Sequence, residues 1–230
     1  MPIQGLKNTD NKDNGKEVFH FPASKNALII FTRNPELGKC KTRLAVTVGD
    51  EAALEIYKFL LKHTAEISAH VNADKFVFYS EKQRENDYWS EAVFRKKVQQ
   101  GDDLGIRMEH AFNEVFSLGY ERAIIIGSDM FDMNTEDINE AFQKLASNSF
   151  VLGPAEDGGY YLLGMNTIKP ELFKNKNWGT HTVQKHTLKD LKEESVALLA
   201  EKNDIDYYAD IKDIEAFQKF LPVHLDNTID

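Results

Sequence analysis

The stretch Ala123–Asp129, which reads AIIIGSD, decides the fold. Its apolar part, Ala123–Ile126, is typical of a strand that is buried on both faces of a parallel sheet. The turn Gly127-Ser128-Asp129 follows at once, at the carboxyl end of this strand. Because open α/β sheets bind ligands beyond the carboxyl ends of their strands, we expect chemistry at this turn.

Similar apolar runs alternate with helical patterns on both sides of this stretch. We expect strands at Ala27–Phe31, Lys75–Tyr79, Phe150–Gly153, Tyr160–Met165 and Ser195–Leu199. We expect helices at Glu51–Ser68, Leu104–Leu118, Thr135–Leu145, Thr182–Lys192 and Asp210–Phe220. Thr135 should open its helix with an imperfect capping box, because Ile138 stands where the motif needs Glu or Gln. The alternation predicts a three-layer α/β/α fold with a mostly parallel central sheet.

Composition limits the domain organisation and the partners. The chain has 230 residues, which suits one catalytic domain over 26–230 behind a flexible N-terminal arm, 1–25. The arm lacks the apolar run of a secretory signal, and no segment is long enough to span a bilayer. A net charge of -9 argues against nucleic acid as a partner. The single cysteine, Cys40, fits a reducing compartment, so we expect a cytoplasmic protein. Composition does not decide the oligomeric state.

A basic stretch follows the first expected strand, from Arg33 to Leu44. Its cations, which include Arg33, Lys41 and Arg43, could neutralise a phosphate chain, and Gly38 would let the backbone approach it. The spacing is not that of a Walker A loop. The pattern alone is equally compatible with a solvated basic loop.

Carboxylates and glycines mark three further places. Asp129 is suited to a hard divalent ion such as Mg²⁺ or Mn²⁺, although it could instead cap a helix. Asp204 and Asp206 could complete a metal site or merely lead into the last helix. The stretch Gly153–Tyr161, GPAEDGGYY, could border a ligand pocket or form a plain hairpin turn. Trp178 could stack on a base or sugar, although core packing is favoured for it.

Six stretches, in order, carry a family resemblance. They are GKCKTRL (Gly38–Leu44), QQGDDLGIRM (Gln99–Met108), IGSDMFDM (Ile126–Met133), LGPAEDGGYYLLG (Leu152–Gly164), WGTHTV (Trp178–Val183) and NDIDYYADI (Asn203–Ile211). Together they resemble a bacterial family of GT-A-fold nucleotide-diphospho-sugar transferases, some of which are linked to arsenosugar biosynthesis as glycosyltransferases. The basic stretch is also similar to that of phospholactate guanylyltransferases, which share the fold.

The resemblance implies a site. Phosphates would be held by Arg33, Lys41 and Arg43, near Gly38, and Asp129 would be the main metal ligand with Asp206, or Asp204, in support. The nucleotide would lie along Asp103, Gly105 and Arg107. The donor or acceptor pocket would be shaped by Asp157, Gly158, Gly159, Tyr160 and Trp178.

The chain departs from the family pattern beside this site. Met130 and Phe131 replace a usual Cys-Pro, His181 ends a segment that usually reads Trp-Ser-Thr-Pro, and Tyr207 and Tyr208 replace Thr-Pro. The expected partners are a nucleotide or nucleotide-sugar and a small acceptor. Three functions stay open: glycosyl transfer from a nucleotide-diphospho-sugar, nucleotidyl transfer from a nucleoside triphosphate to a phosphorylated acceptor, and nucleotide-sugar binding without catalysis.

Overall fold

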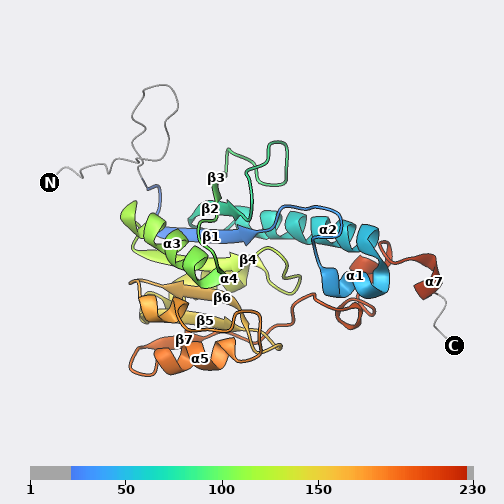
Figure 1. Ribbon diagram of the computed structural model, residues 1–230. Helices are drawn as coiled ribbons and strands as arrows, with labels where there is room; N and C mark the ends of the chain where they lie inside the picture. The colour runs from blue at the N-terminus through green and yellow to red at the C-terminus, as the bar shows by residue number, and fades with distance from the viewer. Residues whose placement is uncertain (1–21, 227–230) are drawn as a thin grey trace.

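The computed structural model describes residues 22–226, so most of the expected N-terminal arm lies outside the described residues. Within them, seven strands form one sheet in the order β3-β2-β1-β4-β6-β5-β7 (Figure 1). The strands are β1 (Asn26–Thr32), β2 (Asp74–Tyr79), β3 (Phe94–Val98), β4 (Arg122–Gly127), β5 (Phe150–Pro154), β6 (Tyr160–Met165) and β7 (Val196–Leu198). The helices are α1 (Thr42–Val48), α2 (Asp50–Ala69), α3 (Leu104–Ser117), α4 (Thr135–Lys144), α5 (Val183–Asp190), α6 (Glu215–Gln218) and α7 (Val223–Asp226).

The sheet is mostly parallel, as expected. β1 pairs in parallel with β2 and β4, β2 with β3, and β5 with β7. Only β6, among the described strands, runs antiparallel to both of its neighbours, β4 and β5. The Gly-rich turn therefore does join an antiparallel pair, and it lies at the same edge as the carboxyl ends of β1 and β4.

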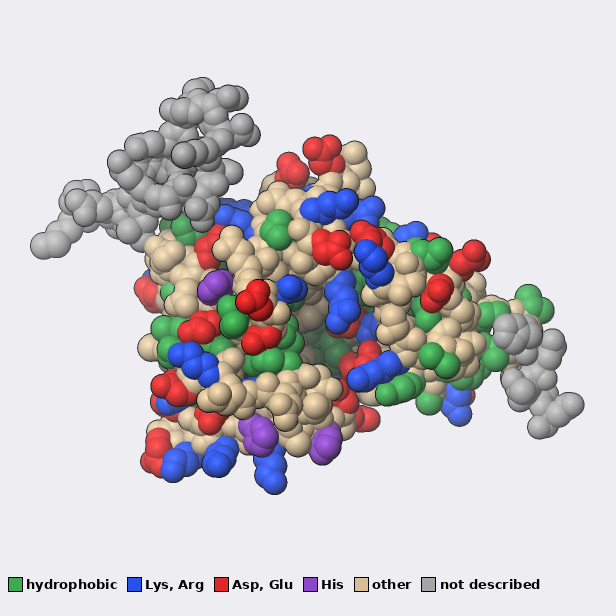
Figure 2. Space-filling view, in the orientation of Figure 1, with side chains coloured by type: hydrophobic (Ala, Val, Ile, Leu, Met, Phe, Trp, Pro, Cys, Tyr) green, Lys and Arg blue, Asp and Glu red, His purple; other side chains and the backbone are tan. Residues whose placement is uncertain are grey.

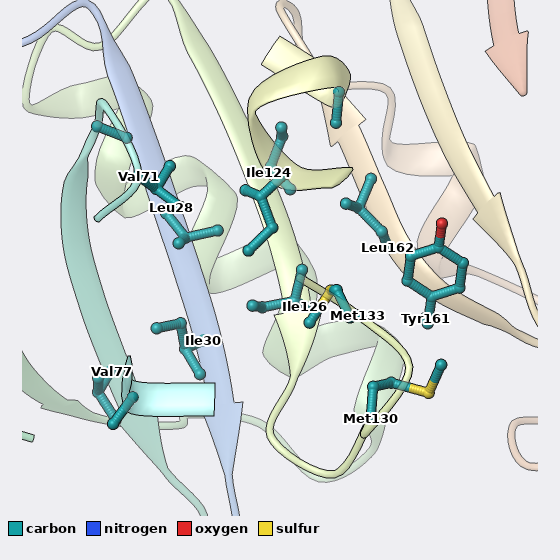
Figure 3. Close-up of a cluster of buried hydrophobic side chains, with 14 of the residues drawn as sticks. Leu28, Ile30, Val71, Val77, Ile124, Ile126, Met130, Met133, Tyr161 and Leu162 are labelled. Carbon is teal, nitrogen blue, oxygen red and sulfur yellow. The ribbon is translucent and has the colours of Figure 1, made fainter. Parts of the chain in front are cut away.

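Alternating side chains build a core on each face of the sheet. Leu28 and Ile30 of β1 join the cluster covered by α2 and α4 (Figure 3). Ile29 of the same strand and Ile125 of β4 join the cluster covered by α3. All four side chains are buried. The period of two along each strand thus produces the three-layer α/β/α arrangement that the sequence predicts.

A third cluster attaches the C-terminal segment to α1 and α2. Leu44 of α1 and Ile56 of α2 pack with Ile205 and Phe217, all fully or almost fully buried. The Phe217 ring meets that of Phe59 edge-on, with centroids 5.4 Å apart. This packing carries the segment around 204–206 back to the sheet edge where β1 and β4 end.

Two local predictions were wrong. The expected helix Asp210–Phe220 is only a 3₁₀ turn at Tyr208–Asp210 followed by the short α6. Asn134, not Thr135, caps α4, and with Asp137 it forms a complete capping box. β3 and α1 were not predicted. Across the described residues, no helix is long and apolar enough to cross a bilayer.

Candidate functional site

Three loops and the C-terminal segment meet at the carboxyl edge of the sheet. They are the loop after β1, the turn after β4, the turn between β5 and β6, and residues 204–206. Figure 2 shows this face hollowed near its centre, with acidic and basic side chains around the opening. Four of the residues expected in the site form a charged cluster there.

The charged cluster consists of Lys41, Arg43, Asp129 and Asp206. Lys41 Nζ donates to Asp129 Oδ2 at 2.8 Å and to Asp206 Oδ1 at 3.1 Å. Arg43 Nη1 donates to Asp206 Oδ2 at 3.0 Å. The Lys41 side chain is only 4% exposed, whereas that of Arg43 is 53% exposed. Lys41 is therefore the inner cation of the cluster, and Arg43 lies at its mouth.

The pairing keeps the inner groups charged. Burial raises the pKa of the Asp129 carboxyl, but the Lys41 ammonium outweighs it and Arg33 adds to the effect, so the pKa is lowered overall. Burial lowers the pKa of Lys41, but Asp129 and Asp206 outweigh it, so that pKa is raised. Asp204 differs, because burial, then Asp206 and Asp157, raise its pKa to about 6.

The two paired carboxylates fit a divalent cation. Asp129 and Asp206 direct one oxygen each at a single cation, the ammonium of Lys41. Carboxylate oxygens are hard ligands, and Mg²⁺ is commonly held by one or two of them together with substrate phosphates. No group of three or more His, Cys, Asp or Glu side chains between residues 22 and 226 is arranged to hold a metal by itself.

Hydroxyl groups fix the loop after β1 to the turn after β4. The Tyr57 hydroxyl, from α2, accepts a hydrogen bond from the Arg33 backbone N–H at 2.9 Å and lies 3.3 Å from Ser128 Oγ. Ser128 Oγ in turn donates to Thr32 Oγ1 at 3.1 Å. Sequence reasoning missed Tyr57 and Thr32. The signal that could have found Tyr57 is a hydroxyl on the apolar face of a helix, since such a group needs a buried partner.

A polar cavity of about 650 Å³ lies on one side of Asp129. It is lined by Arg33, Asp103 and Arg107, as expected, and also by Asn34, Ser80, Glu81, Gln99 and Asp102. Asp103 caps α3 by accepting from the Ile106 N–H, and Arg107 Nε donates to the Gly101 carbonyl at 2.8 Å. These contacts shape the wall that the resemblance assigns to the nucleotide.

A smaller cavity of about 250 Å³ lies on the other side of Asp129. Expected pocket residues line it, namely Asp157, Gly159, Tyr160 and Trp178. Most of the remaining lining is apolar, including Phe31, Leu104, Met108, Ile125, Ile126, Met130, Tyr161 and Val183. Asp204 also lines it, and no Lys or Arg between residues 22 and 226 does. The two cavities adjoin, because Asp129 and three other residues line both, and we refer to them together as a cleft with a polar half and an apolar half.

Three expected glycines lie outside both linings and act through the backbone. A Cβ on Gly105 would lie 2.2 Å from the Phe173 carbonyl oxygen, so this glycine allows close packing beneath Trp178. Gly158 has φ 84°, and a Cβ there would lie 2.3 Å from the His181 carbonyl oxygen. Gly38 has φ 71° in the exposed turn before Cys40. Positive φ explains glycine at the last two positions without a ligand.

The chain is similar to a known family and to several solved structures. A family model for uncharacterised proteins conserved in bacteria (DUF2064) matches residues 63–180. The crystal structure of a provisionally named nucleotide-diphospho-sugar transferase from Desulfovibrio desulfuricans G20 is 32% identical, with a TM-score of 0.74, and covers 80% of this chain and 83% of that one. No curated protein sequence matches the chain.

Two more distant structures share the fold. CMP:2-keto-3-deoxy-manno-octonic acid synthetase complexed with CTP is 10% identical, with a TM-score of 0.53 over 85% of this chain and 99% of that one. Rv0371C of Mycobacterium tuberculosis H37Rv, in complex with manganese, is 12% identical, with a TM-score of 0.53 over 82% of this chain and 97% of that one. The family model and the 32%-identical structure confirm the resemblance, and the predicted GT-A-type fold is confirmed as well.

Proposed function

The chain belongs to the DUF2064 family, and from this premise we propose that it is a metal-dependent transferase that uses a nucleotide-diphospho-sugar donor. One observation carries the proposal. Asp129 and Asp206 direct their oxygens at one cation position, and Asp129 lies where the polar and apolar halves of the cleft meet. Such a donor is divided in a comparable way, with a charged nucleotide diphosphate at one end and an uncharged sugar at the other.

Each part of the cleft has a role in this proposal. The nucleotide lies in the polar cavity, against Asp103 and Arg107. Its diphosphate lies near Arg33, Lys41 and Arg43, whose N–H groups suit phosphate oxygens. Asp129 and Asp206 hold Mg²⁺ or Mn²⁺. When bound, that ion stabilises the negative charge that develops on a leaving diphosphate.

The apolar cavity supports glycosyl transfer over its main alternative. Among the residues that the structure describes, the charged members of its lining are Asp129, Asp157 and Asp204. A phosphorylated acceptor placed there would meet the like charge of Asp157 and Asp204, whereas Lys41 and Arg43 are not among the described residues that line this cavity. A sugar is neutral, and carboxylates can accept bonds from its hydroxyl groups while Trp178 packs against its apolar face.

Nucleotidyl transfer is the second candidate. The observation in its favour is the basic stretch between β1 and α1, whose Lys41 contacts Asp129 at the polar cavity. In that reaction an acceptor phosphate attacks the α-phosphorus and pyrophosphate leaves.

The test compares the parent with Asp129→Asn, and with Asp132→Asn as a control of equal charge change. Asp132 is exposed and lines neither described cavity. Each protein is incubated with Mn²⁺ and a panel of nucleotide-sugars, and ³¹P NMR follows the products. We expect slow release of nucleoside diphosphate from one donor, lost in Asp129→Asn and kept in Asp132→Asn.

Other products would change the assignment. Pyrophosphate released from a nucleoside triphosphate in the presence of a phosphorylated acceptor would favour nucleotidyl transfer. Tight donor binding without turnover, across a broad acceptor panel, would favour binding without catalysis.

A further inference from the structure

We propose that Lys41 occupies the cation position of the nucleotide-free protein and leaves it when a nucleotide binds, so that the divalent ion binds well only together with the nucleotide. The inference rests on the proposed function, because it concerns the same two carboxylates. It adds an order to the assembly of the site and gives Lys41 a role separate from phosphate contact.

The first step is the position of the ammonium. Lys41 Nζ lies within hydrogen-bond distance of both Asp129 and Asp206, at 2.8 and 3.1 Å. A divalent ion shared by the same carboxylates would lie close to this ammonium. Two cations only a few ångströms apart repel each other strongly where water is scarce. Water is scarce here because the Lys41 side chain is only 4% exposed. The ammonium and the ion are therefore alternatives.

The second step is the backbone that holds the lysine there. Lys41 has φ 48° and ψ 47°, the left-handed region that non-glycine residues rarely adopt. It precedes α1 as the N-cap residue, yet its side chain makes no capping hydrogen bond. The neighbouring cations Lys39 and Arg43 are largely exposed, with 61% and 53% of their side chains accessible. Of these three, Lys41 is the one whose side chain is buried between Asp129 and Asp206.

The third step is what would draw the lysine away. Phosphate oxygens offer the ammonium a charged acceptor in place of the carboxylates, and they offer the metal ion further ligands. A diphosphate beside Arg43 would thus release Asp129 and Asp206 and complete the ion's coordination. Binding of nucleotide and ion is then mutually favourable, and this coupling must be reciprocal.

The test measures Mn²⁺ affinity without nucleotide, by the electron paramagnetic resonance signal of free Mn²⁺. The variants are Lys41→Met and Arg43→Met, which remove one positive charge each from the same cluster. Lys41→Met should bind Mn²⁺ about tenfold more tightly than the parent, a typical size for such coupling. Arg43→Met should show no comparable gain, because it leaves the Lys41 ammonium in place. Thermal unfolding checks that each variant is folded, and Lys41→Gln replaces Lys41→Met if that variant is not.

The possible outcomes distinguish failure of this proposal from failure of the proposed metal-dependent function. Equal Mn²⁺ affinity in the parent and Lys41→Met would overturn it, and so would an equal gain in Arg43→Met, which would indicate only a general effect of net charge. Failure of all the proteins to bind Mn²⁺, even with ADP, CDP, GDP or UDP, would instead overturn the proposed metal site itself.

Discussion

Asp204 should lower the stability of the protein at neutral pH, so its replacement by asparagine should raise it. The carboxyl lines the apolar cavity, and burial, followed by Asp206 and Asp157, raises its pKa from the ordinary 3.8 to about 6. The folded state therefore holds this proton more tightly than the unfolded state. Between about pH 4 and pH 6 the unfolded chain loses the proton first, and the free energy of unfolding falls as the pH rises.

The magnitude follows from this difference in pKa. About two pKa units correspond to about 3 kcal/mol at full effect. The side chain is only partly buried, and screening by solvent reduces the effect to about 1 kcal/mol. Asp204→Asn should therefore unfold at higher urea concentration than the parent at pH 8, and the gain should shrink toward pH 4.5.

Tryptophan fluorescence during urea unfolding, in buffer with EDTA, provides the measurement. Asp132→Asn controls for the general loss of one negative charge, since Asp132 is exposed and lies outside the cleft. A variant that is no more stable than the parent at pH 8 would refute the reasoning. A gain of the same size at every pH would refute it as well, because the effect must follow the titration.

Three further predictions concern other parts of the molecule. Replacing Lys41 and Arg43 together by alanine should weaken nucleoside diphosphate binding by more than about 2 kcal/mol but leave nucleoside binding unchanged in calorimetry; equal losses would make the loop structural. Gly158→Ala should reduce the urea midpoint more than Gly179→Ala. Both glycines have positive φ, but only at Gly158 would the added Cβ meet another part of the backbone, so similar losses would contradict the clash. Asn134→Ala should lower the free energy of unfolding by about 1 kcal/mol through loss of the α4 cap, and an unchanged thermal midpoint would rule this out.

The central strands are predicted well from the sequence because buried strands of this kind consist almost entirely of apolar residues. β1 and β4 are apolar over nearly their whole length and are buried on both faces. β3 escaped prediction for the opposite reason. It reads FRKKV at the edge of the sheet, where Lys96 pairs with Asp87 and Lys97 with Glu114. An edge strand can carry such charges because one of its sides is open.

The site was predictable in its members but not in its contacts. Strand ends indicate where Asp129 and the basic loop lie, since parallel strands present their carboxyl ends at one edge. The spacing of residues in the sequence does not indicate that Lys41 pairs with Asp129 and Asp206. The same limit explains the closing helix, whose apolar residues fit a helical period. In the fold, Ile211 and Phe217 instead anchor separate turns to α1 and α2.

The packing of the C-terminal segment against α1 and α2 has a consequence for folding during synthesis. Lys41 and Asp206 are 165 positions apart, and every strand of the sheet precedes Asp206 in the chain. During synthesis all the strands of the sheet are therefore made before the second carboxylate, and because a domain folds as a unit, Lys41 finds its full set of partners only when the end of the domain has been made. Until then Lys41 has only Asp129 to neutralise it. The cleft should therefore be completed late, and a chain stopped after β7 would lack one side of its cation position together with the part of the third cluster that Ile205 and Phe217 supply.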